Sequence, residues 1–249
     1  NRQSDATAKL QQLVKQFPKS TRVEEATFQM GEAAYAQDAF DQALAHYTSV
    51  TQNWPEGTFA PHAQHGLGWT HFKRGDFQKA ADAMTTLASK YAKSEVAPKG
   101  LYVRAMARYQ LGEFQSAADD ATAFLQSKPA KTDMLDAQYL LGLALAGQQK
   151  FDEAAKTYSA ILTADPKYSG ADKVAYELGW AYVELGRRSE AVTAFRRLAA
   201  DYPSSPLAAE SLFRVGESFY DAGEFADATK AYTDARQKAG NSELGEKAV

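Results

Sequence analysis

Two helical patterns joined by a tight turn occupy residues 205–240, with the sequence SPLAAESLFRVGESFYDAGEFADATKAYTDARQKAG. In the first part, apolar residues recur at the three- and four-residue spacing of one helix face. Gly223 and Glu224 form the predicted turn, because glycine adopts the left-handed backbone at the least cost. The second part has the same helical spacing and ends at Gly240. The stretch therefore predicts a helix–turn–helix unit.

The same unit recurs along the chain at an offset of 37 residues. An aromatic column is preceded by a column of small residues and followed by alanine, a large residue and a helix-stopping residue. The aromatic column is Phe40, Phe77, Phe114, Phe151, Arg188 and Phe225, and the small column is Gly31, Gly68, Ala105, Gly142, Gly179 and Gly216. The alanine column is Ala43, Ala80, Ala117, Ala154, Ala191 and Ala228, and the large column is Tyr47, Met84, Ala121, Tyr158, Phe195 and Tyr232. The helix-stopping column is Pro55, Ala92, Pro129, Pro166, Pro203 and Gly240. Small residues at a fixed spacing predict close contact between helices.

Short signals mark where the helices of each unit begin and end. Glycine occupies the turn at Gly75, Gly112, Gly186 and Gly223. Asp38 and Gln149 replace it in the other two units, so those turns should be less favourable. Serine is expected to cap the first helix of several units, at Ser20, Ser94 and Ser205. In the last of these units Pro206 follows, at the expected first helical position.

The order of glycine, aromatic residue, alanine, aromatic residue and proline resembles the tetratricopeptide repeat (TPR), a helix–turn–helix unit that usually has about 34 residues. The resemblance covers nearly the whole chain, in six copies in phase. It implies an all-α fold, a right-handed α-α superhelix or TPR solenoid of about six helix–turn–helix repeats. The extra residues of each unit fall between the proline and the next helix. We expect them to lengthen that helix by about one turn.

The period also predicts the repeat boundaries and the two ends. The six repeats are expected at residues 20–56, 57–93, 94–130, 131–167, 168–204 and 205–240. Residues 1–19 match the second helix of a preceding repeat, and residues 241–249 match the start of a following helix. We therefore expect a segment of a longer array, whose ends expose apolar surface that favours self-association.

The TPR resemblance further implies a binding surface. In TPR proteins the first helices of the repeats line a concave groove that binds a peptide or a helix of another protein. Aromatic residues recur on that face here, and tyrosine and tryptophan are enriched where binding energy concentrates. Carried over position by position, the groove comprises Phe28, Glu32, Tyr35, His62, His65, Trp69, Lys73, Lys99, Tyr102, Met106, Tyr109, Tyr139, Lys173, Tyr176, Trp180, Phe213, Glu217 and Tyr220.

Two interpretations of this face stay open. The rings either bind a partner or pack neighbouring first helices together, and the binding role is favoured for Trp69 and Trp180, the two bulkiest. The chain as a whole is either a protein-binding scaffold or a structural spacer and oligomerisation array within a longer protein. Arg188, in the aromatic column, either kinks its helix or lays its stem over the neighbouring helix, and the stem is favoured.

The proline, the short polar link and the alanine-rich helix also resemble bacterial cell-envelope TPR proteins. These include the periplasmic coordinator of the Tol-Pal system and lipoprotein components of outer-membrane assembly. The resemblance implies a periplasmic or cell-envelope location, with a cytoplasmic location as the alternative.

The composition weighs against other functions. The 28 Lys and Arg residues against 31 Asp and Glu residues give a net charge of −3, so no nucleic-acid partner is expected. No stretch is long and apolar enough for direct membrane insertion. Without cysteine, a phosphate-binding loop or a hydrolase motif, we expect neither an enzyme nor a cofactor. His62 and His65 supply only two ligands, so no metal site is expected. Asp119 and Asp120 are expected to be surface charge.

Overall fold

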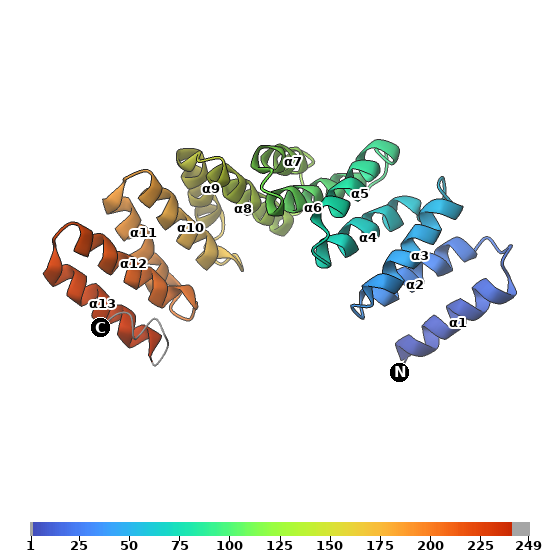
Figure 1. Cartoon of the computed structure of the whole chain (residues 1–249), viewed down its shortest axis with the longest axis horizontal. Helices are drawn as coiled ribbons and strands as arrows, with labels where there is room; N and C mark the ends of the chain where they lie inside the picture. The colour runs from blue at the N-terminus through green and yellow to red at the C-terminus, as the bar shows by residue number, and fades with distance from the viewer. Residues whose placement is uncertain (1, 241–249) are drawn as a thin grey trace. The chain divides into compact units, whose positions relative to one another are not determined.

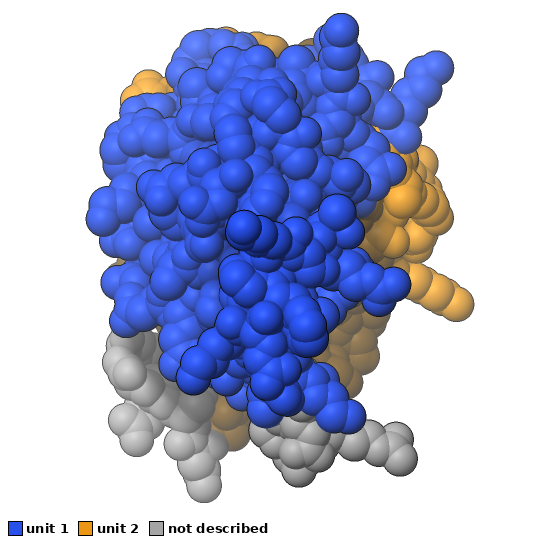
Figure 2. Space-filling model, turned by 90° about the vertical axis from the view of Figure 1, so that its right-hand side faces the viewer, with its two compact units in different colours: residues 1–128 blue, residues 129–249 orange. Residues whose placement is uncertain are grey.

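A computed structural model describes residues 2–240 of the chain, with side chains described from Ala6 onward. The regular secondary structure of these residues is entirely helical and comprises 13 helices (Figure 1). The chain divides into two compact units, residues 1–128 and 129–249 (Figure 2). The predicted all-α TPR solenoid is confirmed. The helix expected to begin within residues 241–249 lies outside the described residues.

The first unit contains a single helix followed by three antiparallel helix pairs. The helices are α1 (Arg2–Gln16), α2 (Val23–Tyr35), α3 (Phe40–Asn53), α4 (Ala60–Lys73), α5 (Phe77–Lys90), α6 (Ala97–Gln110) and α7 (Phe114–Gln126). Within a pair the helices lie side by side, and the second helix of one pair packs on the first helix of the next (Figure 1).

The second unit contains three further pairs. Its helices are α8 (Lys131–Gly147), α9 (Phe151–Ala164), α10 (Ala171–Glu184), α11 (Arg188–Asp201), α12 (Leu207–Asp221) and α13 (Phe225–Ala239). They pack in the same order, so each helix contacts mainly its neighbours along the chain. Among residues 2–240, no helix combines the length and the apolar character needed to cross a membrane.

The turn inside each pair has one recurring backbone structure. The left-handed residue is Gly75 in the second pair, with φ +80°, and Gln149 in the fourth pair, with φ +62°. After each left-handed residue, the next N–H donates to a carbonyl five residues back, as in Asp76 N to His71 O at 2.9 Å. This is the Schellman pattern, which satisfies carbonyls at the end of the first helix. Asp38 and Gln149 therefore adopt the same conformation as the glycines, at a higher backbone cost.

The small column lies where the two helices of a pair approach most closely. A Cβ atom added to Gly142 would lie 2.3 Å from Tyr158 Cε1, and one added to Gly179 would lie 2.4 Å from Phe195 Cε1. The rings of the large column therefore press directly against the backbone of the first helix. This contact explains why a small residue faces a large one in most repeats.

The third repeat fills the same space with a different set of side chains. Ala105 replaces glycine and Ala121 replaces the ring, and both are completely buried. The missing volume is supplied one turn later by Phe124, at a position where the neighbouring repeats have Leu87 and Ile161. Phe124 packs against Tyr102 with ring centroids 5.5 Å apart. The packing volume is therefore redistributed within this repeat.

The expected longer first helices are wrong in all but one repeat. The extra residues form two successive turns instead, as in Ser94 N to Tyr91 O at 2.9 Å and Ala97 N to Ser94 O at 3.1 Å. Only α8, with 17 residues, is extended by about one turn. The turns hold the links in place, and Tyr91 Oη also donates to Pro55 O of the preceding link at 3.0 Å.

The expected serine caps are also wrong in position. Ser20, Ser94 and Ser205 lie inside the link turns, and the helices begin two or three residues later. Each serine hydroxyl accepts a hydrogen bond from the N–H two residues on, such as Leu207 N to Ser205 Oγ at 3.1 Å. Pro206 is the residue immediately before α12 rather than its first residue. These serines therefore stabilise turns, which use the same side-chain chemistry as caps.

Asp120 corrects the expectation that both aspartates of α7 are surface charge. Asp119 is exposed, but Asp120 is only 4% exposed. Arg104 donates to its two carboxylate oxygens at 2.8 and 2.6 Å, and Arg108 donates a third hydrogen bond at 2.7 Å. A buried carboxylate needs such partners because desolvation of an unpaired charge is costly. Asp120 is therefore part of the packing between α6 and α7.

Candidate partner-binding groove

All of the predicted groove residues lie on the first helices of the helix pairs. In the first unit they lie on α2, α4 and α6, and in the second unit on α8, α10 and α12. The predicted residues therefore form two groups, one in each of the two compact units.

The rings at one groove position pack on the second helix of their own pair. These half-buried rings are Phe28 on Tyr47, Tyr102 on Phe124, Tyr139 on Tyr158, Tyr176 on Phe195 and Phe213 on Tyr232, with centroids 5.2 to 6.2 Å apart. These contacts are within a pair, whereas the packing interpretation concerned neighbouring first helices, for which Phe28 of α2 and His62 of α4 provide one contact, with ring centroids 6.0 Å apart. A partner could contact the parts of these half-buried rings that remain exposed.

A second set of rings lies near the turn of each pair. Tyr35 packs on Phe40, Tyr109 on Phe114 and Tyr220 on Phe225, with centroids 5.5 to 5.9 Å apart. Tyr220 is the most exposed of these three tyrosines, with 58% of its surface exposed. In the first unit, Glu32 accepts a hydrogen bond from the hydroxyl of Tyr47, so this predicted groove carboxylate is tied to the helix-pair core. Burial, together with Glu32, raises the pKa of Tyr47.

His62 and His65 form a partly buried pair on α4. His65 lies edge-on to Trp69, with ring centroids 6.4 Å apart. Burial, with smaller contributions from Lys99 and His62, lowers the pKa of His65 to about 4. Nδ1 of His62 and Nε2 of His65 are buried without a hydrogen-bond partner, while Nε2 of His62 lies 3.6 Å from Glu95. Within the described residues, no three His, Cys, Asp or Glu side chains are grouped to hold a metal.

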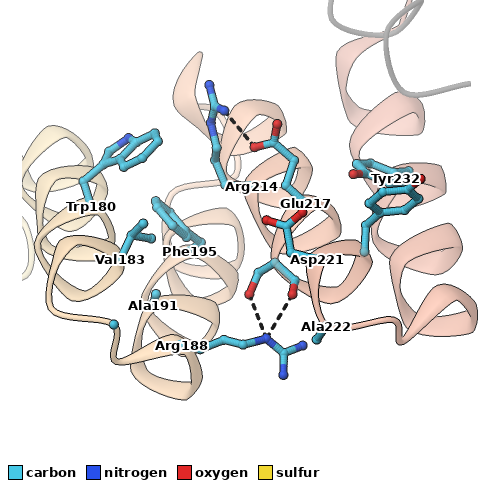
Figure 3. Close-up of a pocket in the computed structure, with 13 residues that line it drawn as sticks. Trp180, Val183, Arg188, Ala191, Phe195, Arg214, Glu217, Asp221, Ala222 and Tyr232 are labelled. Carbon is cyan, nitrogen blue, oxygen red and sulfur yellow. Dashed lines mark hydrogen bonds and ion pairs between the residues drawn. The ribbon is translucent and has the colours of Figure 1, made fainter.

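The second unit contains a pocket of about 600 Å³ between α10, α11, α12 and α13 (Figure 3). Trp180, Glu217 and Tyr220 of the predicted groove line it. The lining also includes Val183, Phe195, Arg188, Arg214, Asp221 and Tyr232. Phe195 is buried, whereas Val183 is 42% exposed. The pocket thus has an apolar side with accessible surface.

Arg214 forms one wall of the pocket. Its guanidinium carbon lies 5.1 Å from the centroid of the Trp180 ring. It donates a hydrogen bond to Glu217 Oε2 at 2.7 Å (Figure 3) and a second to Glu210 Oε1 at 2.5 Å. Burial acts to lower the pKa of Arg214, but the hydrogen bond to Glu217 and the charge of Glu210 outweigh it, and the pKa is raised. Arg214 is therefore a fixed cation stacked on an aromatic ring.

Arg188 lies at the other side of the pocket, at the start of a regular α11. Its Nε donates to Ser218 O at 2.9 Å, and its Nη1 donates to Glu224 at 2.9 Å. The guanidinium carbon lies 5.2 Å from the centroid of Phe219. Arg188 thus extends over the neighbouring helix, and the alternative of a kinked helix is not observed.

Two carboxylates of α12 lie on the remaining side. Glu217 and Asp221 are one helical turn apart, and both act on Tyr232 of α13, where burial and these two charges raise the pKa of the phenol. The sequence interpretation missed Arg214, because arginine stands at a position outside the carried-over groove pattern. Asp221 occupies the same repeat position as Lys73, a predicted groove residue, so the repeat register had already placed it on the groove face.

The helix pairs, their left-handed turns and their packing columns define the chain as a TPR protein. A TPR family model matches residues 25–57. The model of the YfiO outer membrane lipoprotein family matches residues 60–217, more than half of the chain. The chain belongs to this family.

Solved structures share the fold. A crystal structure of MamA is 22% identical, with a TM-score of 0.63 over 73% of this chain and 93% of that chain. A tetratricopeptide repeat protein from Parabacteroides merdae is 15% identical, with a TM-score of 0.64 over 99% and 90% of the two chains. YrrB, described as a TPR protein with an unusual peptide-binding site, is 13% identical, with a TM-score of 0.61 over 81% and 96%. No curated protein sequence matches the chain.

Proposed function

We propose that the chain is a protein-binding scaffold of the bacterial cell envelope, and that the first-helix face binds a peptide or helix of a partner protein. The observation that carries the proposal is the pocket of about 600 Å³ lined by Trp180, Glu217 and Tyr220. Its volume is in the range of sites that hold a small ligand or a few side chains. Membership of an outer membrane lipoprotein family supports the envelope location.

The pocket and the predicted groove around it suit binding rather than catalysis. TPR scaffolds are generally non-enzymatic. In the peptide-binding modes known for helical proteins, affinity comes from a few anchoring side chains that enter pockets. An aromatic pocket with fixed charged groups provides such an anchor point. The other residues of the predicted groove then supply contact area.

Site-specific photocrosslinking in the producing cells tests the proposal. A photoreactive phenylalanine analogue replaces Tyr220, which is 58% exposed and lines the pocket. The matched control replaces Lys156 of α9, whose side chain is 75% exposed and which does not line this pocket. Tyr220 is a better site than Trp180, because Trp180 is half-buried and the guanidinium of Arg214 lies over its ring.

We expect the variant at Tyr220 to yield a discrete covalent adduct with another protein, and the variant at Lys156 to yield none. Equal labelling at both positions, or no adduct at Tyr220 in a folded variant, would contradict groove binding. Such a result would favour the alternative of a spacer or an oligomerisation array. That alternative predicts instead that changing Leu10 or Leu13 of α1 alters the assembly state.

A further inference from the structure

The pocket between α10 and α13 has an unbalanced charge. Arg214 is held between Glu210 and Glu217, so one cation faces two carboxylates. Arg188 is paired with Glu224, and its guanidinium lies over Phe219, which does not line the pocket. Asp221 adds a further carboxylate to the lining. Counting these groups together, carboxylates outnumber guanidinium groups, and the excess negative charge is on α12.

Asp221 is the carboxylate best placed to receive a new partner. It is exposed, and no ion pair is formed by it within the part of the chain that the structure describes. Glu217, one turn earlier on α12, shares its charge with Arg214 but keeps 40% of its side chain exposed. Figure 3 shows both carboxylates on the pocket side of α12, between Trp180 and Tyr232. A cation entering here would reduce the repulsion between them.

The apolar side of the pocket suits an aliphatic stem. Val183 and Tyr220 keep 42% and 58% of their surface exposed, and the Trp180 ring already accepts the guanidinium of Arg214 at 5.1 Å. Lysine and arginine combine an apolar stem with a cationic head, so they can cover such a surface while the head reaches a carboxylate. Aromatic rings near the head add cation–π attraction.

We propose that this pocket binds a lysine or arginine side chain of the partner, with its stem against Val183 and Tyr220 and its cationic head at Asp221 and Glu217. The inference rests on the proposed function and specifies the partner as a segment in which a basic residue adjoins a large apolar one. Exposed lysines lie elsewhere on the predicted groove face, at Lys73 and Lys99 in the first unit and at Lys173 in the second, and none of them lines this pocket. The charge preference is therefore specific to this pocket.

Peptide selection on the intact chain tests the inference. A library of random dodecapeptides displayed on phage is selected against the wild-type protein, and enriched sequences are synthesised with a fluorescent label. Each peptide is also made with norleucine in place of its basic residue, because norleucine keeps an aliphatic stem and removes the charge. Affinities are measured by fluorescence anisotropy for the wild type, for Asp221→Asn and for Asp227→Asn. Asp227 is an exposed carboxylate of α13 outside the pocket lining, so it controls for net charge.

We expect a basic residue beside a large apolar residue in the enriched peptides, and about a tenfold loss of affinity for either the norleucine peptide or Asp221→Asn. In combination, the two changes should cost little more than one alone, while Asp227→Asn should have almost no effect. The inference is overturned if no peptide is enriched, if enriched peptides lack a basic residue, or if the two asparagine variants behave alike. Circular dichroism and the melting temperature establish that both variants are folded.

Different results contradict groove binding and the preference for a basic side chain. If Tyr220 crosslinks to a partner while the peptides show no dependence on Asp221, the groove binds protein but the lysine or arginine preference is wrong. If Tyr220 gives no crosslink and no peptide is enriched, the groove itself is not the binding surface.

Discussion

His65 shows how a single groove residue is changed by its surroundings. Its ring lies against Trp69 on α4, near His62 on the same helix and Lys99 on α6. Burial lowers its pKa to about 4, so the imidazole stays neutral at the pH of most compartments. A neutral ring can pack with the neighbouring aromatic residues, and a protonated one would meet the positive charge of Lys99.

The lowered pKa of His65 predicts that the folded chain becomes less stable in acid. Because the pKa of His65 is lower in the folded chain than the ordinary value of 6.5, the unfolded chain binds the proton first as pH falls. The free energy of unfolding should be unaffected by His65 above pH 6.5 and should fall by about 1–3 kcal/mol between pH 6.5 and 4. Urea titrations at pH 7, 5 and 4 on the wild type and on His65→Gln measure the difference. An identical pH dependence in the two proteins would contradict the assignment.

At the scale of the element, the residues at three positions fill the space between the two helices of each pair. The fifth repeat uses Gly179, Phe195 and Leu198, whereas the third repeat uses Ala105, Ala121 and Phe124 at the same positions. Both sets bury their side chains against the partner helix. The second repeat, with Gly68, Met84 and Leu87, differs from the fifth only in the large side chain, whereas the third repeat exchanges all three residues and combines alanine at the small position with alanine in the large column.

The third repeat thus supplies a test within the same molecule. In Gly179→Ala the new Cβ would lie 2.4 Å from Phe195 Cε1, and we expect a loss of about 2–3 kcal/mol in the free energy of unfolding. The triple variant Gly179→Ala, Phe195→Ala, Leu198→Phe reproduces the set of the third repeat. It should recover at least half of that loss in urea unfolding. A triple variant no more stable than Gly179→Ala would show that the close approach does not depend on these volumes.

At the scale of the whole molecule, the chain consists of two compact units, residues 1–128 and 129–249. Each helix contacts mainly its neighbours in sequence, so stability in such arrays is approximately the sum of local terms. A local defect should then weaken the unit that contains it more than the other unit.

Replacing Asp120 creates such a local defect in the first unit. Asp120→Ala leaves Arg104 and Arg108 without their shared carboxylate, and we expect a loss of about 2–3 kcal/mol, because these side chains are largely buried. Hydrogen exchange should show faster exchange in α5, α6 and α7, and unchanged protection in α10 to α13. Asp119→Ala removes an exposed carboxylate next to it and should leave exchange unchanged. Equal loss of protection in both units would show that the molecule unfolds as one cooperative body.

The sequence by itself determined the helix pairs, their left-handed turns and the close helix contacts, because these depend on residues a few positions apart. Turn glycines and prolines act on their own backbone, and the small column recurs at the same place in every unit. The conformation of the links between consecutive helix pairs was harder to predict, because serine stabilises both helix caps and turns. Only the tertiary structure decided that Asp120 is buried, that Arg188 reaches over Phe219, and that Arg214 and Asp221 share a pocket with Trp180. Those pairings depend on which faces of separate helices meet and on the length and direction of each side chain, and a repeat period carries neither.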